Sequence, residues 1–276
     1  MLAIKDWLLD ASQRLSSTGI TSAHLDAEII LAHTLRKNRT YLHGHVDDIL
    51  TAYDQEVADA RLALRLDRVP IAYIIGHKEF YGRRFTVTTA TLIPRPESED
   101  IVDVIKKLVP KNLSLLDDGY RLVDVGTGTG CLGITAKLEL PDIDVTLLDI
   151  SPYALKVAAS NASRLNADVR SIKSDLLARY PFKADMVVAN LPYVDPSWDR
   201  SPETNHEPDL ALFADDGGKA LMIKLISQAP QSLRANGYLL LEADPTQHAA
   251  LIDFAHGHGF HLKKKLGYCL ALQKTT

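Results

Sequence analysis

The tetrapeptide Asn-Leu-Pro-Tyr at residues 190–193 follows an apolar run and combines groups that suit a planar amine. The Asn190 side chain and the Leu191 backbone each offer a carbonyl acceptor, and the Tyr193 ring offers a stacking face. Two acceptors can hold the two hydrogens of an NH2 group while the ring clamps its plane and Pro192 stiffens the turn. Acceptors on the N–H bonds also raise electron density at nitrogen, which favours attack on a methyl sulfonium. These four residues predict a site that methylates an amide or an exocyclic amine.

A glycine-rich segment, "DVGTGTG" at residues 124–130, also follows an apolar run. Its glycines allow a tight turn in which backbone N–H groups face a ligand. Gly128, Gly130 and Gly133 fit the G-x-G-x-x-G pattern, and Asp149 lies about 20 residues on, where an acceptor for ribose hydroxyls is expected. The pattern leaves two adenosine cofactors open, a nicotinamide dinucleotide and S-adenosyl-L-methionine. Residues 190–193 favour the second, because hydride transfer has no use for them.

Two further residues suit the adenine end of such a cofactor. Asp175 can accept a hydrogen bond from an adenine amino group, and Leu176 can pack on the ring. A Ser-Asp pair is also a common helix opening, so the structural interpretation of Asp175 stays open.

These residues must be positioned by the elements of residues 94–276, where strands and helices alternate. Such alternation predicts an α/β fold with a mostly parallel sheet. Ligands in these sheets bind beyond the carboxyl ends of the strands, so the polar residues after successive strands should share one site. Residues 260–274 predict two further strands that meet at Gly267 and add an antiparallel C-terminal edge. The predicted strands are residues 121–126, 144–150, 169–174, 184–190 and 237–244, and the predicted helices are residues 131–140, 151–165 and 218–233.

The first part of the chain has a different pattern. Residues 1–76 are helical in pattern throughout and predict a small helical bundle. β-branched and aromatic residues around Gly82, Arg83 and Arg84 then predict a β-hairpin linker over residues 77–93. We therefore expect three parts, residues 1–76, 77–93 and 94–276.

Composition limits the classes of partner. The 276 residues carry a formal net charge of -4, which gives no basic excess, so direct nucleic-acid binding is not expected. The sequence contains no run of about 18 apolar residues, so we expect no membrane span. The cysteines, Cys131 and Cys269, lie far apart without metal spacing and fit a reducing compartment, so we expect a cytoplasmic protein. His256, His258 and His261 suggest a loop more than a metal site, and no metal is expected.

Seven segments together resemble the HemK/PrmC family, the glutamine methyltransferases that act on peptide chain release factors. The segments are "PIAYIIGHKEFYGRRF", "IPRPESE", "DVGTGTG", "LDIS", "NLPY", "HEPDLALFADDGGKAL" and "NGYLLLEADPTQ". The resemblance implies a Rossmann-like S-adenosylmethionine-dependent methyltransferase domain, with residues 1–76 helping to dock the substrate. It also implies methylation of the side-chain amide nitrogen, N5, of the glutamine in the Gly-Gly-Gln loop of class-1 release factors.

The resemblance also implies roles for individual residues. The catalytic residues would be Asn190, Leu191, Pro192 and Tyr193. The cofactor-binding residues would be Asp124, Gly126, Thr127, Gly128, Thr129, Gly130, Asp149, Asp175, Leu176 and Asn190, with Arg95 bordering the cofactor.

This sequence departs from the family pattern at two places. The family usually has Asn-Pro-Pro-Tyr, whereas the second residue here is Leu191; its backbone carbonyl can serve, although the turn loses one φ restraint. The C-terminal "LGYCLALQK" lacks an expected Asp-Arg pair.

Three alternatives stay open. A ribosomal-protein glutamine methyltransferase would use the same motif. An adenine amino-group methyltransferase on DNA or RNA would need a basic groove. A nicotinamide-dependent oxidoreductase would leave residues 190–193 without a role.

Overall fold

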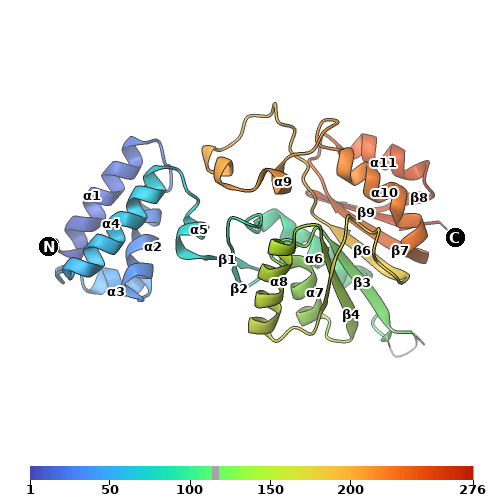
Figure 1. Cartoon of the computed structure of the whole chain (residues 1–276), viewed down its shortest axis with the longest axis horizontal. Coiled ribbons are helices and arrows are strands. Elements are labelled where there is room, and N and C mark those ends of the chain that lie inside the picture. The colour runs from blue at the N-terminus through green and yellow to red at the C-terminus, as the bar shows by residue number, and fades with distance from the viewer. Residues whose placement is uncertain (114–117, 276) are drawn as a thin grey trace. The chain divides into compact units, whose positions relative to one another are not determined.

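The computed structural model describes residues 1–113 and 118–275, and the chain forms two compact units. One unit comprises Met1–His77 with Arg200–His206, and the other comprises Lys78–Asp199 with Glu207–Thr276. Figure 1 shows helices α1 to α5 of the first unit in blue to cyan and the sheet of the second unit in green to red. Each unit has its own hydrophobic core.

The first unit is helical, as expected. Its core gathers apolar side chains spaced three to four residues apart, such as Trp7, Ala11 and Leu15. A buried ion pair joins Arg65 to Asp26 at 2.7 Å. Its helices are α1 (Ile4–Ser17), α2 (Ala23–Leu35), α3 (Arg39–Gly44), α4 (Ala52–Leu66), α5 (Ile71–Ile75) and the 3-10 helix η3 (Pro202–His206).

The second unit contains a two-stranded hairpin, β1 (His77–Phe80) with β2 (Arg83–Thr86), and a seven-stranded sheet of order β5-β4-β3-β6-β7-β9-β8. The sheet strands are β3 (Tyr120–Val125), β4 (Ile143–Asp149), β5 (Arg170–Lys173), β6 (Ala184–Ala189), β7 (Leu233–Glu242), β8 (Phe260–Leu266) and β9 (Cys269–Lys274). The helices are η1 (Pro96–Ser98), α6 (Glu99–Leu108), α7 (Cys131–Glu139), α8 (Pro152–Leu165), α9 (Asp209–Leu212), α10 (Ala220–Ser232) and α11 (His248–His256).

The sheet is parallel from β5 to β7, and only β9 runs antiparallel to its neighbours β7 and β8. The expected parallel sheet with an antiparallel C-terminal edge is therefore confirmed. The chain passes from β3 to β4 on one side and later returns to β6 on the other side. This reversal creates a topological switch point between β3 and β6, where ligands of such sheets bind.

Helices cover both faces of the sheet (Figure 1). Along β6, Met186 and Val188 pack into a core shared with α6, α7 and α8, whereas Val187 packs into a core shared with α10 and α11. Alternate side chains of a strand point to opposite faces, so a strand buried on both faces is a continuous apolar run. In residues 1–113 and 118–275, none of the helices is both long and apolar enough to span a bilayer.

Candidate active site

The register of the sheet brings the residues that follow four strands to one edge. Val125 of β3 pairs with Leu148 of β4 and with Ala189 of β6, and Ala189 also pairs with Leu241 of β7. The next residues along each strand or just beyond it, which include Gly126, Asp149, Asn190 and Glu242, therefore lie side by side. Three of them are among the residues that the sequence proposed for the site; Glu242 is not.

The glycine loop after β3 is held tightly against its neighbours. Gly126, Gly128 and Gly130 have φ values of 70, 54 and 81°, which favour glycine. A Cβ on Gly126 would lie 2.7 Å from Leu191 Cδ2, and one on Gly130 would lie 2.5 Å from Ile134 Cδ1. The loop therefore needs glycine both for its backbone conformation and for its close approach to the turn at Leu191.

Asp124 holds the glycine loop through hydrogen bonds from its buried side chain. Its buried Oδ2 atom accepts hydrogen bonds from the Thr127 hydroxyl at 2.6 Å and from the Gly133 N–H at 2.9 Å. Burial raises the pKa of Asp124 to about 6, and these hydrogen bonds oppose the rise. The side chain thus contacts the loop itself, which supports a role in shaping the loop.

Asp149 at the end of β4 joins the loop to the next helix. Its Oδ2 atom accepts from the Gly128 N–H and its Oδ1 atom accepts from the Ser151 N–H, both at 2.9 Å. Burial raises the pKa of this carboxyl, and the backbone hydrogen bonds oppose that rise. A carboxylate has about four acceptor positions, so these hydrogen bonds do not use all of them.

Asn161 on α8 is a buried connection that the sequence did not reveal. Its Nδ2 atom donates to the Thr129 carbonyl at 2.9 Å and to the Thr86 carbonyl at 3.0 Å, while its Oδ1 atom accepts from the Thr86 N–H. The glycine loop is thereby fastened to strand β2 of the hairpin. The only local signal was an amide on the inner side of a small-residue helix.

The Asn-Leu-Pro-Tyr turn follows β6, and its polar side-chain atoms differ in whether they have a hydrogen-bond partner. Asn190 Nδ2 donates to the Ser98 hydroxyl at 3.0 Å, whereas its buried Oδ1 atom has no partner in the part of the chain that the structure describes. Leu191 is buried against Gly126. The Tyr193 hydroxyl donates to Glu242 at 3.3 Å, and burial raises the pKa of Tyr193.

Gln247 and the Gly217-Gly218 pair contact the backbone of this turn. Gln247 Nε2 donates to the backbone carbonyls of Tyr193 and Gly217, both at 2.8 Å. A Cβ on Gly218 would lie 1.9 Å from the Tyr193 carbonyl oxygen, so only glycine fits this contact. The Gly217-Gly218 pair was quoted in the sequence resemblance, but nothing local to it indicated a contact with the turn.

Glu242 completes the cluster at the end of β7. The side chain is buried, with 1% of the residue exposed, and its Oε2 atom has no hydrogen-bond partner among the residues described. Burial raises the pKa of its carboxyl to about 7, although interactions with Ser98, Tyr193 and Asn190 favour the charged form. The sequence signal was a carboxylate closing an apolar strand, the same signal as at Asp149.

Known proteins match the chain along most of its length. Residues 6–76 match the PrmC N-terminal domain, and residues 97–205 match the methyltransferase small domain. A release factor glutamine methyltransferase of Koribacter versatilis is 35% identical over 265 residues, which covers 92% of each chain. The chain belongs to the release factor glutamine methyltransferase family. The family expected from the seven segments is thus confirmed.

Other members and structures agree with this family membership. A release factor glutamine methyltransferase of Deinococcus radiodurans is 36% identical over 248 residues, which covers 88% of this chain and 87% of that protein. The crystal structure of a methyltransferase from Pyrococcus furiosus shares the fold, with a TM-score of 0.55 at 18% identity over 79% of this chain and 98% of that one. The Rossmann-like methyltransferase fold is confirmed.

The structure also shows the contacts of three further residues that were proposed to bind the cofactor. Arg95 pairs at 2.5 Å with the buried Glu207, which also accepts from the Ile93 N–H. The exposed Asp175 pairs with Lys224 at 2.6 Å. Leu176 is buried, with a φ of 48°. The cofactor roles of these residues stay predictions.

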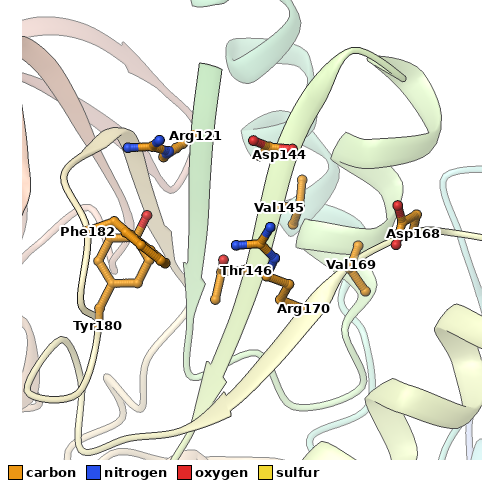
Figure 2. Close-up of a pocket in the computed structure, with 9 residues that line it drawn as sticks. All are labelled: Arg121, Asp144, Val145, Thr146, Asp168, Val169, Arg170, Tyr180 and Phe182. Atoms are coloured by element: carbon orange, nitrogen blue, oxygen red, sulfur yellow. The ribbon is translucent and has the colours of Figure 1, made fainter. Parts of the chain in front are cut away.

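A cavity of about 130 Å³ lies at the opposite ends of the strands. Figure 2 shows Arg121 and Thr146 on the sheet facing Tyr180 and Phe182 on the loop that leads to β6. Because these residues stand near the amino ends of β3 and β4, the cavity is separate from the strand-end site. Among the described residues, no group of three or more His, Cys, Asp or Glu side chains could hold a metal ion.

Proposed function

We propose that this enzyme transfers a methyl group from S-adenosyl-L-methionine to the side-chain amide nitrogen, N5, of the glutamine in the Gly-Gly-Gln loop of class-1 release factors. The observation that carries the choice of substrate is the similarity, over 92% of both chains, to a protein named release factor glutamine methyltransferase. The partnerless Asn190 Oδ1 atom supports it, because a primary amide brings N–H donors to such an acceptor. The proposal includes a cytoplasmic location, with the release factor as protein partner.

The residues present fit the cofactor. The glycine loop, Gly126–Gly130, has its three glycines at positive φ and would face the cofactor with backbone N–H groups. Asp149 would accept from the ribose hydroxyls with the lone pairs that its backbone hydrogen bonds leave free, and Leu176 would pack on the adenine. When bound, S-adenosyl-L-methionine supplies an electrophilic methyl group on a positively charged sulfur.

The residues of the turn would activate and hold the substrate amide. An amide nitrogen is a poor nucleophile, because its lone pair is delocalised into the carbonyl group. If Asn190 Oδ1 and the Leu191 carbonyl each accept one N–H, they raise electron density at nitrogen and stabilise the positive charge that develops there. The Tyr193 ring would hold the plane of the amide so that its lone pair points outward. Fixing this orientation contributes several kcal/mol to lowering the barrier.

We further propose that residues 1–76 recognise the release factor, that residues 77–93 act as a linker, and that residues 94–276 carry out methyl transfer. The match of residues 6–76 to the PrmC N-terminal domain supports this division. Hydrogen exchange tests it: addition of the release factor should protect amides within residues 1–76. Protection confined to residues 94–276 would contradict the proposal.

The substrate is tested by comparing candidate methyl acceptors. The purified protein is incubated with radiolabelled S-adenosyl-L-methionine and, in separate reactions, with a class-1 release factor, ribosomal proteins or DNA. We expect label in the release factor, and label that accumulates far more slowly there when Asn190→Ala replaces the wild type. Label in ribosomal proteins or in DNA, with none in the release factor, would support one of the alternative substrates instead.

A further inference from the structure

Glu242 stands beside the Asn-Leu-Pro-Tyr turn in a position that stability does not explain. Because Ala189 pairs with Leu241, Asn190 and Glu242 are neighbours across the ends of β6 and β7. The residue is 1% exposed, and no cation pairs with its carboxylate among the residues that the structure describes. Burying an unpaired carboxylate is costly, so an apolar or amide side chain would stabilise this position better. A functional constraint is the more economical explanation.

The surroundings of Glu242 contain acids and neutral groups. Glu97 of η1 raises the pKa of the carboxyl, while the Tyr193 and Ser98 hydroxyls and the Asn190 amide lower it. Burial, with a further contribution from the Glu242 carboxylate, raises the pKa of the Cys131 and Cys269 thiols to about 12, so both thiols are neutral at pH 7. In the described residues, neutral hydrogen-bond donors stabilise the charge of Glu242, and no cation forms an ion pair with it.

These donors determine the orientation of the Asn190 amide. A carboxylate only accepts hydrogen bonds, so the groups that face it must present their hydrogens. Ser98 interacts with Glu242 and accepts from Asn190 Nδ2 at 3.0 Å. With Nδ2 held on this side, Asn190 Oδ1 is turned away and is left without a partner in the described structure. That atom is the acceptor that the proposed chemistry requires.

We propose that Glu242 is a positioning residue for methyl transfer: through Ser98 and Tyr193 it keeps Asn190 Oδ1 free for the substrate amide and holds the aromatic ring in place. This inference rests on the proposed function. It assigns to the end of β7 a role that complements the turn after β6.

The protonation of Glu242 should control this arrangement. A protonated carboxyl donates a hydrogen bond and competes for Ser98 Oγ or Asn190 Oδ1, which weakens the orientation of the amide. Burial raises the pKa of Glu242 to about 7, so the carboxylate forms as the pH rises through that value. The turnover number of the wild type should therefore increase between pH 6 and pH 8, within about one unit of that midpoint.

The test is Glu242→Gln, which preserves the shape of the side chain but adds an N–H donor and cannot ionise. We expect the turnover number to fall roughly 100-fold, the effect of misplacing a reacting group. The dissociation constant of S-adenosyl-L-methionine, measured by calorimetry, should change less than about threefold. The pH dependence near pH 7 should disappear. Glu139→Gln, which removes a carboxylate paired with Arg83 and Lys106, is the control and should retain wild-type turnover.

A second measurement requires no substrate. The side-chain NH2 resonances of Asn190, identified by their loss in Asn190→Ala, should shift with a midpoint near pH 7 in the wild type and stay constant in Glu242→Gln. Failure of the wild type to methylate a release factor would refute the proposed function. The NMR titration of Asn190 would still test the positioning role, because it needs no substrate. The positioning role would be refuted if Glu242→Gln kept wild-type turnover. It would also be refuted if the Asn190 resonances had the same pH dependence in Glu242→Gln as in the wild type.

Discussion

Replacing Glu242 with glutamine should stabilise the protein at neutral and alkaline pH. Burial raises the pKa of this carboxyl from 4.5 to about 7 in the folded protein. Between these two values the folded state binds more protons at Glu242 than the unfolded state does. The free energy of unfolding therefore decreases as the pH rises through this window. The stabilising contribution is complete below pH 4.5 and lost above pH 7, and glutamine avoids that loss.

The size of the stability change follows from the pKa shift of Glu242. The difference between its ordinary pKa of 4.5 and its pKa of about 7 in the folded protein is about 2.5 pH units. At about 1.4 kcal/mol per unit, ionisation of Glu242 lowers the free energy of unfolding by on the order of 3 kcal/mol. Most of this loss, roughly 2 to 3 kcal/mol, falls between pH 5 and pH 8. Asp124, whose pKa is also raised, titrates in both proteins and so cancels from the comparison.

Urea unfolding at pH 5 and pH 8, followed by circular dichroism, measures the difference. Relative to the wild type, Glu242→Gln should gain stability as the pH rises from 5 to 8. The control again is Glu139→Gln, whose carboxyl has a pKa lowered by Lys106 and Arg83 and so stabilises the fold above its unfolded pKa. That variant should be less stable than the wild type at both pH values. A Glu242→Gln variant that is less stable at pH 8, or a difference that does not change with pH, would refute the reasoning.

Three further substitutions test separate parts of the site. Asn190→Ala should lower the turnover number by about 100-fold while calorimetry finds cofactor affinity nearly unchanged, because its acceptor acts on the charge that develops in the transition state. Asp149→Asn should weaken the binding of S-adenosyl-L-methionine by about 10-fold, because it removes one charge-assisted hydrogen bond. Turnover at saturating cofactor should be largely retained. Gly218→Ala should lower both the melting temperature and the turnover number, since its Cβ would lie 1.9 Å from the Tyr193 carbonyl oxygen, whereas Gly44→Ala, with open space around its Cβ, should change neither.

The sheet and the glycine loop were predictable because their signals are local. Segments such as "VTLLD" and "MVVAN", in which aliphatic residues end on a polar residue, indicated the parallel strands and their carboxyl ends. Helix α11 was not predicted, since its short segment between Gln247 and the histidine-rich turn offers only about two turns of periodic pattern. The family resemblance supplied the connection between these elements and a reaction.

The supporting contacts of the site were not predictable, because they join residues far apart in the chain. Leu191 was recognised as a departure from the family pattern, but only the structure shows its side chain filling the space above Gly126. Glu242 and Ser98 lie in segments that carried the family resemblance, but only the structure shows that they meet at Asn190. Hydrogen bonds of this kind depend on the register of the sheet, which local periodicity does not specify.

The location of the transferred methyl group tests the central claim most directly. A class-1 release factor is incubated with the enzyme and S-adenosyl-L-methionine, digested, and analysed by fragmentation mass spectrometry. We predict a gain of about 14 mass units on the glutamine of the Gly-Gly-Gln loop and on no other residue. An unmodified glutamine, or a methyl group found on another residue of the release factor, would contradict the proposed function.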